Sequence, residues 1–142
     1  VISNLVSKNF LTMEEAKLLD KKALINFKNS TLFKRIVESE EVLREYRFSI
    51  MLPTSQIING ASEAENIVVE GALDCAFKED GKYIIIDYKT DRADNCKSLY
   101  EKYKSQLEIY KKAIEEIKGA EVSEIGIFSF SLGEYFNNKN IN

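Results

Sequence analysis

Two aspartates and a lysine interrupt the most apolar part of the sequence. Asp74 stands within the run VEGALDCAF, and Asp87 and Lys89 stand within YIIIDYKT. Both runs are rich in the β-branched and aromatic residues typical of buried strands. A charge inside such a strand is costly unless a partner compensates it, so these three residues are the first candidates for chemistry.

The dipeptide Asp80-Gly81 between the two runs predicts a tight β-hairpin. With these two residues as the loop, or with a four-residue loop around them, the register places Asp74 directly opposite Asp87; a loop of three or five residues would not. Side chains on one face of a strand recur every second residue, so Lys89 lies on the same face as Asp87. Two carboxylates and an ammonium therefore converge on one side of the predicted hairpin.

Electrostatics favours a metal ion in this arrangement. Opposed Cβ atoms lie about 4.5 to 5.5 Å apart, and two like charges at that separation repel by about 3 kcal/mol at an effective dielectric constant near 20. A surface ion pair with Lys89 returns at most about 1 kcal/mol. Because the chain has no histidine, its oxygen ligands favour a hard cation, Mg²⁺ or Mn²⁺, over zinc. Gly71, just before Asp74, would let backbone or substrate approach closely.

Each of these residues taken alone has a simpler interpretation. An aspartate at the end of an apolar strand is commonly a turn cap or a salt-bridge partner. The three residues together favour the metal site.

A second polar feature lies in a long helix predicted from about residue 98 to 118. Gln106 is the only amide in its apolar stripe, and Tyr110 follows four residues later on the same face. The two side chains could hydrogen-bond a phosphate, a base or the shell of a metal. Alternatively, Gln106 lies at the edge of the stripe and Tyr110 belongs to the core. The stripe also contains Leu99, Tyr103, Leu107, Ala113, Ile114 and Ile117.

Composition indicates one globular domain. Of 142 residues, 44% are hydrophobic and 11% aromatic, which is enough for a core. No apolar stretch approaches the roughly 18 residues of a membrane span. The sequence begins without a methionine or a basic leader, which suggests a cytoplasmic fragment of a longer protein. Cys75 in an apolar run and Cys96 in a polar loop form no disulfide framework, so a reducing compartment fits best.

Charge argues against a general polyanion-binding protein. The net charge is -3 and the pI is near 5.2, whereas nonspecific nucleic-acid binders usually carry a basic excess. Lysines do gather between residues 89 and 112, where the simplest interpretation is a solvated helix face.

Capping signals predict helices over the first 40 residues. Thr12 and Glu15 form a capping box, Asp20 can cap a second helix, and Ser30 or Thr31 can open a third.

Strands and one long helix are predicted over the rest of the chain. Alternation and apolar runs predict strands over residues 46–52, 67–77, 83–88 and 122–130, with a last short strand after the turn at 132–134. Pro53 ends the first strand, and Gly119 ends the helix in a left-handed conformation. The order predicts a mixed α/β (α+β) fold with a central sheet: one domain over 1–142, with a helical lead-in over 1–40 and a core over 41–142.

The motifs GALD, DYK and QLEIY, in this order, resemble those of the PD-(D/E)XK nucleases of RecB type. The longer pattern VVEGALDCAF, YIIIDYKTDR, YKSQLEIYKKAIEEI and GIFSFSLGE is similar to the C-terminal nuclease domains of the bacterial ATP-dependent helicase/nucleases of the AddA or RexA family. The resemblance extends to REYRFSIMLP and covers most of the chain. It implies a restriction-endonuclease-like core with a central mixed sheet flanked by helices.

The resemblance also implies an activity and roles at the catalytic centre. The activity is Mg²⁺-dependent exonucleolytic hydrolysis of DNA during double-strand break repair, with Mn²⁺ as a possible substitute. Asp74 and Asp87 would bind the metal together with the backbone carbonyl of Tyr88. Lys89 would orient the attacking water and stabilise the developing charge.

Four further residues are implied around this centre. Gln106 and Tyr110 would support the site or hold the DNA strand, and Thr90 is placed with them. Glu45 matches a family glutamate with a structural or supporting role. Glu70 stands where many members have glutamine.

The resemblance implies partners as well. These are a single DNA strand from unwound duplex, expected to be the 3'-ended one, and a partner protein of the AddB or RexB type. ATP would bind only in helicase domains outside this chain. The family's upstream histidine is missing, so we expect weak Mg²⁺ binding by this piece alone. The alternatives are a Cas4-like or restriction-type nuclease, and a noncatalytic DNA-binding or subunit-contact module of the same fold.

Overall fold

The computed structural model describes residues 21–56, 60 and 65–140. Within these residues the strands form one mixed sheet in the order β1-β2-β3-β4-β5. All neighbours are antiparallel except β3 and β4, which are parallel and connected through α5. The strands are β1 (Val42–Pro53), β2 (Asn66–Glu79), β3 (Lys82–Lys89), β4 (Val122–Ser129) and β5 (Glu134–Asn137).

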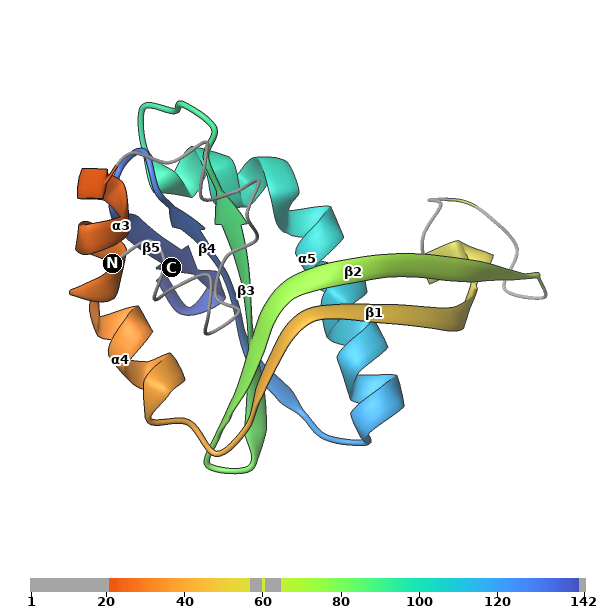
Figure 1. Ribbon diagram of the computed structural model, residues 1–142. Helices are drawn as coiled ribbons and strands as arrows, with labels where there is room; N and C mark the ends of the chain where they lie inside the picture. Colours follow the sequence, from red (N-terminus) through yellow and green to blue (C-terminus); the bar gives the residue numbers. More distant parts are fainter. Residues whose placement is uncertain (1–20, 57–59, 61–64, 141–142) are drawn as a thin grey trace.

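Helices cover both faces of this sheet (Figure 1). On one face lies α5 (Cys96–Lys118), and on the other lie α3 (Lys21–Lys28) and α4 (Thr31–Val37). The short 3-10 helices η1 (Thr54–Gln56) and η2 (Asn138–Asn140) follow β1 and β5. This α+β architecture confirms the predicted mixed sheet flanked by helices.

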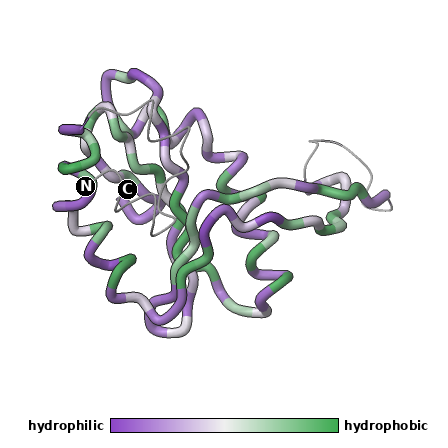
Figure 2. Tube along the Cα trace, in the orientation of Figure 1, coloured by the Kyte–Doolittle hydropathy of each residue, from purple (hydrophilic) through white to green (hydrophobic). Residues whose placement is uncertain are grey.

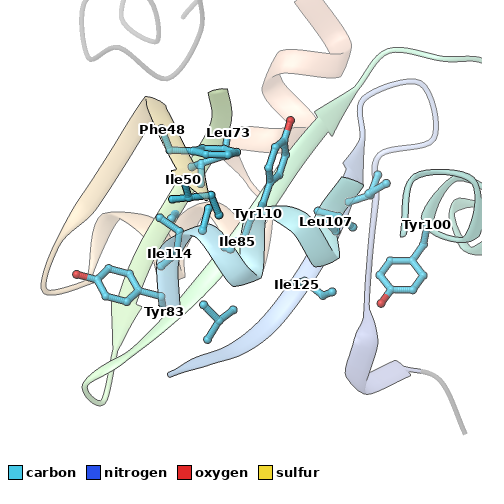
Figure 3. Packing of buried hydrophobic residues seen from close by; sticks show 14 of the residues in the cluster. Phe48, Ile50, Leu73, Tyr83, Ile85, Tyr100, Leu107, Tyr110, Ile114 and Ile125 are labelled. Atoms are coloured by element: carbon cyan, nitrogen blue, oxygen red, sulfur yellow. The ribbon is translucent and has the colours of Figure 1, made fainter. Parts of the chain in front are cut away.

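The sheet separates two hydrophobic cores. The core beneath α5 includes Ile85, Leu107 and Ile114 (Figure 3), whereas Ile84 and Ile86 point into the core beneath α3 and α4. Because β3 is buried on both faces, it reads as a continuous apolar run rather than as an alternation. The central strands are correspondingly the hydrophobic part of the trace in Figure 2.

The hairpin between β2 and β3 has the predicted turn. Asp80 and Gly81 have φ angles of 51° and 78°, the two positive values that a type I′ turn requires. The register also agrees with the prediction, from Glu79↔Lys82 to Cys75↔Ile86.

Strand β2 then leaves β3 and continues with β1 alone. The β1–β2 pairing runs on to Pro53↔Asn66, so the two strands extend from the core as an arm (Figure 1). At the start of this arm the alternation of faces shifts: both Leu73 and Ala76 pack into the core beneath α5. On the facing strand, Glu45 has a φ of 47°, which is rare outside glycine.

Several predicted boundaries need correction. The strands predicted to begin at residues 46 and 67 begin at 42 and 66, because pairing extends them beyond the apolar runs. The long helix begins at Cys96 after the N-cap Asn95, so Cys96 is buried rather than in a polar loop. Ile117, assigned to the apolar stripe, is 40% exposed.

The predicted helix ends agree with the structure where it describes them. Ser30 caps α4 by accepting a hydrogen bond from the Phe33 amide at 3.1 Å. Gly119 ends α5 in the left-handed region with φ 61°. The predicted caps at Thr12, Glu15 and Asp20 lie outside the described residues. Among the described helices, none is long and apolar enough to cross a membrane.

A buried ion pair ties α4 to β4. Glu124 is 4% exposed and accepts hydrogen bonds from Arg35 at 3.0 and 3.2 Å and from the Tyr135 hydroxyl at 2.5 Å. Burial tends to raise the pKa of Glu124, but the hydrogen bonds from Arg35 and Tyr135 outweigh it and hold this pKa below its ordinary value.

We expect Glu124→Gln to remove an acid-sensitive part of the stability. A carboxylate whose pKa is lowered by folding stabilises the fold above its unfolded pKa of about 4.3, and this contribution is lost as the pH falls through the folded value. Urea unfolding at neutral pH should show the variant to be less stable by about 1 to 3 kcal/mol. The difference should shrink in acid.

Glu121→Gln is the matched control, because Glu121 forms an exposed ion pair with Lys82 at 3.4 Å. It should change the free energy of unfolding by less than about 0.5 kcal/mol. A Glu124→Gln deficit that stays constant from neutral pH to about pH 3 would contradict the role assigned to the charge.

Candidate active site

Asp74 lies where β2 separates from β3, at the point we call the fork. The last ladder pair is Cys75↔Ile86, and Asp74 is the next residue along β2. Its Oδ2 accepts a hydrogen bond from the Tyr88 backbone amide at 2.9 Å. A carboxylate therefore takes the place of a strand-to-strand hydrogen bond, which explains how an acidic residue is accommodated at the end of the paired region.

Asp87 and Lys89 are fixed from the opposite side by β4. They pair with Ile127 and Ser129 of that strand, and Asp87 is 4% exposed. Lys89 Nζ lies 2.8 Å from Asp87 Oδ2 in an ion pair whose angles are not those of a hydrogen bond. The structure thus brings these two predicted residues together on one face.

Two other side chains show that Asp74 and Asp87 share one electrostatic environment. Burial, followed by the negative charges of Asp87 and Asp74, raises the pKa of Tyr110 to about 12. Burial alone would lower the pKa of Lys89, but Asp87 and, more weakly, Asp74 raise it above its ordinary value. Although the carboxylates are not a ladder pair, both act on the same phenol and the same ammonium.

The helix α5 brings Gln106 and Tyr110 to this site. Gln106 Nε2 donates a hydrogen bond to the Tyr110 hydroxyl at 2.8 Å. Tyr110 is buried against Phe48, with ring centroids 5.8 Å apart, whereas Gln106 is exposed. Tyr110 therefore belongs to the core through its ring (Figure 3) and to the carboxylate site through its hydroxyl. The two interpretations of this residue do not exclude each other.

Gly71 meets a side chain of its own fold rather than an outside group. A Cβ at this position would lie 2.9 Å from Phe48 Cζ. The absence of a side chain thus lets the Phe48 ring pack across the β1–β2 pair, and that ring in turn supports Tyr110. The prediction that Gly71 admits backbone or substrate is replaced by this packing role.

The other predicted residues lie at the rim. Glu45 is exposed and stands opposite Asp74, between the pairs Arg44↔Cys75 and Tyr46↔Leu73. Thr90 is exposed directly after β3, and Glu70 is exposed on the arm.

Sequence reasoning missed two residues beside Lys89. The Tyr103 ring centroid lies 3.9 Å from Lys89 Nζ, and the Tyr103 hydroxyl donates to Asp91 Oδ2 at 2.6 Å. The sequence predicts Tyr103 only as part of the apolar stripe, yet it lies two turns before Tyr110 on the same face of α5. That spacing is the available signal.

The donor atoms at the fork suit a hard divalent cation. In the described part of the chain, no three His, Cys, Asp or Glu side chains form a metal-binding group. However, Mg²⁺ commonly binds one or two carboxylates and keeps several waters. The amide and carbonyl of a strand residue point to the same side, so the Tyr88 carbonyl faces the fork as its amide does. Asp74, Asp87 and this carbonyl form an oxygen-only set that fits such an ion.

Known proteins share this sequence over nearly its whole length. The family description "PD-(D/E)XK nuclease superfamily" matches residues 6–140. The AddA-type ATP-dependent helicase/nuclease of Clostridium botulinum (strain Loch Maree / Type A3) is 29% identical over 138 residues, covering 94% of this chain and 11% of that protein. Its counterpart of the same name from Geobacillus thermodenitrificans is 33% identical over 146 residues, covering 95% of this chain and 12% of that protein.

The chain therefore spans about a tenth of the length of these relatives. A solved structure described as "Crystal structure of SSO0001" superposes with a TM-score of 0.48 at 15% identity, over 96% of this chain and 60% of that one. The family match includes the hairpin, the long helix and the strands that follow them. The chain belongs to the PD-(D/E)XK nuclease superfamily.

Proposed function

We propose that this chain is the nuclease domain of a bacterial helicase/nuclease of the AddA type and that it hydrolyses DNA phosphodiester bonds with Mg²⁺. The observation that carries the proposal is the grouping of Asp74, Asp87 and Lys89 at the fork of a nuclease-superfamily chain. Within 1–142 we assign the core over 41–142 to catalysis and 1–40 to a helical lead-in.

The described residues support distinct roles at the fork. Asp74, Asp87 and the Tyr88 carbonyl would hold the metal, for which Mn²⁺ could substitute. When bound, the ion would neutralise charge on the phosphate and favour ionisation of the attacking water. Lys89, beside Asp87 at 2.8 Å, would orient that water and stabilise charge developing on the phosphate.

Residues at the edge of the site would contact the DNA. Gln106 is exposed while bonded to Tyr110, so its amide can reach a phosphate or base without leaving α5. Thr90 lies beside this opening, and Glu45 would support Asp74 from the facing strand.

The biological setting follows from the relatives. Their name joins a helicase to a nuclease, so we assign ATP-dependent unwinding to other parts of such a protein. This domain would then act as an exonuclease on a single strand, the 3'-ended one, during double-strand break repair in the bacterial cytoplasm. A protein of the AddB or RexB type would be its partner.

We expect Asp87→Asn and Lys89→Gln each to lower Mg²⁺-dependent degradation of single-stranded DNA by at least about 100-fold, because each removes a group that acts on the reacting phosphate. Release of acid-soluble nucleotides measures the rate. Asp80→Asn and Lys82→Gln are matched controls at the far end of the same hairpin, where both side chains are exposed. Degradation that persists in both site variants would refute the assignment.

Metal binding provides a test that needs no DNA. We expect Mg²⁺ to raise the melting temperature, since a ligand at 100 times its dissociation constant stabilises a fold by about 2.7 kcal/mol. Asp74→Asn should abolish this increase. It should also stabilise the metal-free protein, because an amide oxygen can still accept from the Tyr88 amide while the repulsion with Asp87 disappears.

Glu70→Gln is the control for this experiment, because Glu70 is exposed on the arm, away from the fork. It should keep the full Mg²⁺ response. Melting curves of the unchanged chain that ignore both Mg²⁺ and Mn²⁺, or a destabilised Asp74→Asn, would show that the two carboxylates do not share a metal.

A further inference from the structure

Lys89 is held from two directions. Its ammonium lies 2.8 Å from Asp87 Oδ2 and 3.9 Å from the centre of the Tyr103 ring. The side chain is only 19% exposed. A lysine has a flexible four-carbon stem, so a single ion pair would leave its ammonium many positions around the carboxylate. The ring removes much of that freedom.

The ring contact has a chemical advantage over a second carboxylate. An aromatic face attracts a cation through its quadrupole. It does not occupy one of the three ammonium N–H donors in a strong hydrogen bond. The donors that Asp87 leaves over can therefore point to a water or a phosphate oxygen. A carboxylate in place of Tyr103 would compete for them.

Tyr103 is itself anchored by Asp91. The phenol hydroxyl donates to Asp91 Oδ2 at 2.6 Å, a short bond typical of a charged acceptor. The Asp91 carbonyl accepts from the Ser131 hydroxyl at 2.8 Å, which connects this loop to the turn after β4. Lys102 Nζ lies 3.5 Å from the same Asp91 oxygen. The hydrogen bond to a carboxylate also makes the phenol ring more electron-rich and hence a better cation binder.

We propose that Tyr103 is a positioning residue that fixes the Lys89 ammonium for catalysis, and that Asp91 acts through Tyr103. This inference rests on the proposed nuclease function and adds to it a second tier of residues from α5 and the loop after β3. Tyr103 acts through Lys89 and does not contact the DNA.

A spectroscopic experiment tests the contact without reference to activity. In protein labelled with ¹³C at the lysine ε-carbon, the Lys89 ε-protons should resonate upfield of the other lysines, because they lie over the Tyr103 ring. Lys89→Gln assigns the signal. Tyr103→Leu should return it to the ordinary position, whereas Tyr103→Phe should keep most of the shift.

Tyr46→Leu is the matched control, since Tyr46 carries a different lysine, Lys118, at 5.6 Å from its ring. It should leave the Lys89 signal unchanged. A Lys89 signal that is also unchanged in Tyr103→Leu would overturn the proposal.

Kinetics then tests the consequence. With Mg²⁺ and single-stranded DNA, Tyr103→Leu should lower kcat by at least about 10-fold while KM changes by less than about 2-fold. Tyr103→Phe should recover most of kcat, and Asp91→Asn should fall between the two. Unchanged kcat in Tyr103→Leu, or a raised KM with unchanged kcat, would overturn the positioning role.

The two experiments separate this inference from the proposed function. A wild-type chain with no nuclease activity under any metal would refute the function and the catalytic role of Lys89, and the ε-proton signal would still decide whether Tyr103 holds the ammonium. Should Tyr103→Leu fail to fold, Tyr103→Phe and Asp91→Asn retain the test, because equal kcat in both and in wild type would overturn the role of Asp91.

Discussion

The separation of β2 from β3 at Asp74 is the constraint on which the site depends. Two strands that stayed paired would bury their backbone groups against each other and leave no room for an ion or a phosphate between them. Here the ladder stops at Cys75↔Ile86, and the Asp74 carboxylate takes over the next backbone donor, the Tyr88 amide. The strand end is thereby satisfied, and the opening is lined with oxygen atoms.

The rest of the fold holds this opening in place from both sides. On one side, β4 pairs with β3 along its whole length and keeps Asp87 and Lys89 in register. On the other, β1 accompanies β2 out of the core, and Glu45 adopts its left-handed conformation level with Asp74. Above them, α5 contributes Tyr110 and Tyr103, whose contacts reach both the carboxylate and the ammonium sides of the site.

The hairpin shows how far sequence reasoning reaches. A type I′ turn at Asp80-Gly81 sets the register, and alternation then places Asp87 and Lys89 on one face, so this half of the site follows from local rules. The position of Asp74 does not, because those rules assume continuous pairing and the strands separate one residue before the predicted opposition. That separation depends on β1, which is distant in sequence, and on the positive φ of Glu45, which no composition rule indicates. Likewise, Tyr103 is recognisable as a buried helix position, but its contact with Lys89 depends on how α5 docks on the sheet.

The chain order of the sheet also has a consequence for folding. The residues from Asp74 to Lys89 lie in a hairpin whose contacts are close in sequence; the Asp74–Tyr88 bond spans only 14 positions. Local pairs of this kind close quickly, whereas a parallel pair requires an intervening crossover and forms slowly. Strand β4 can reach β3 only after the 23-residue α5 has been laid down between them. During synthesis the acidic half of the site would thus exist before Tyr110 and β4 arrive, as a charged, half-covered hairpin. The mutual repulsion of its carboxylates would then oppose premature collapse of the opening.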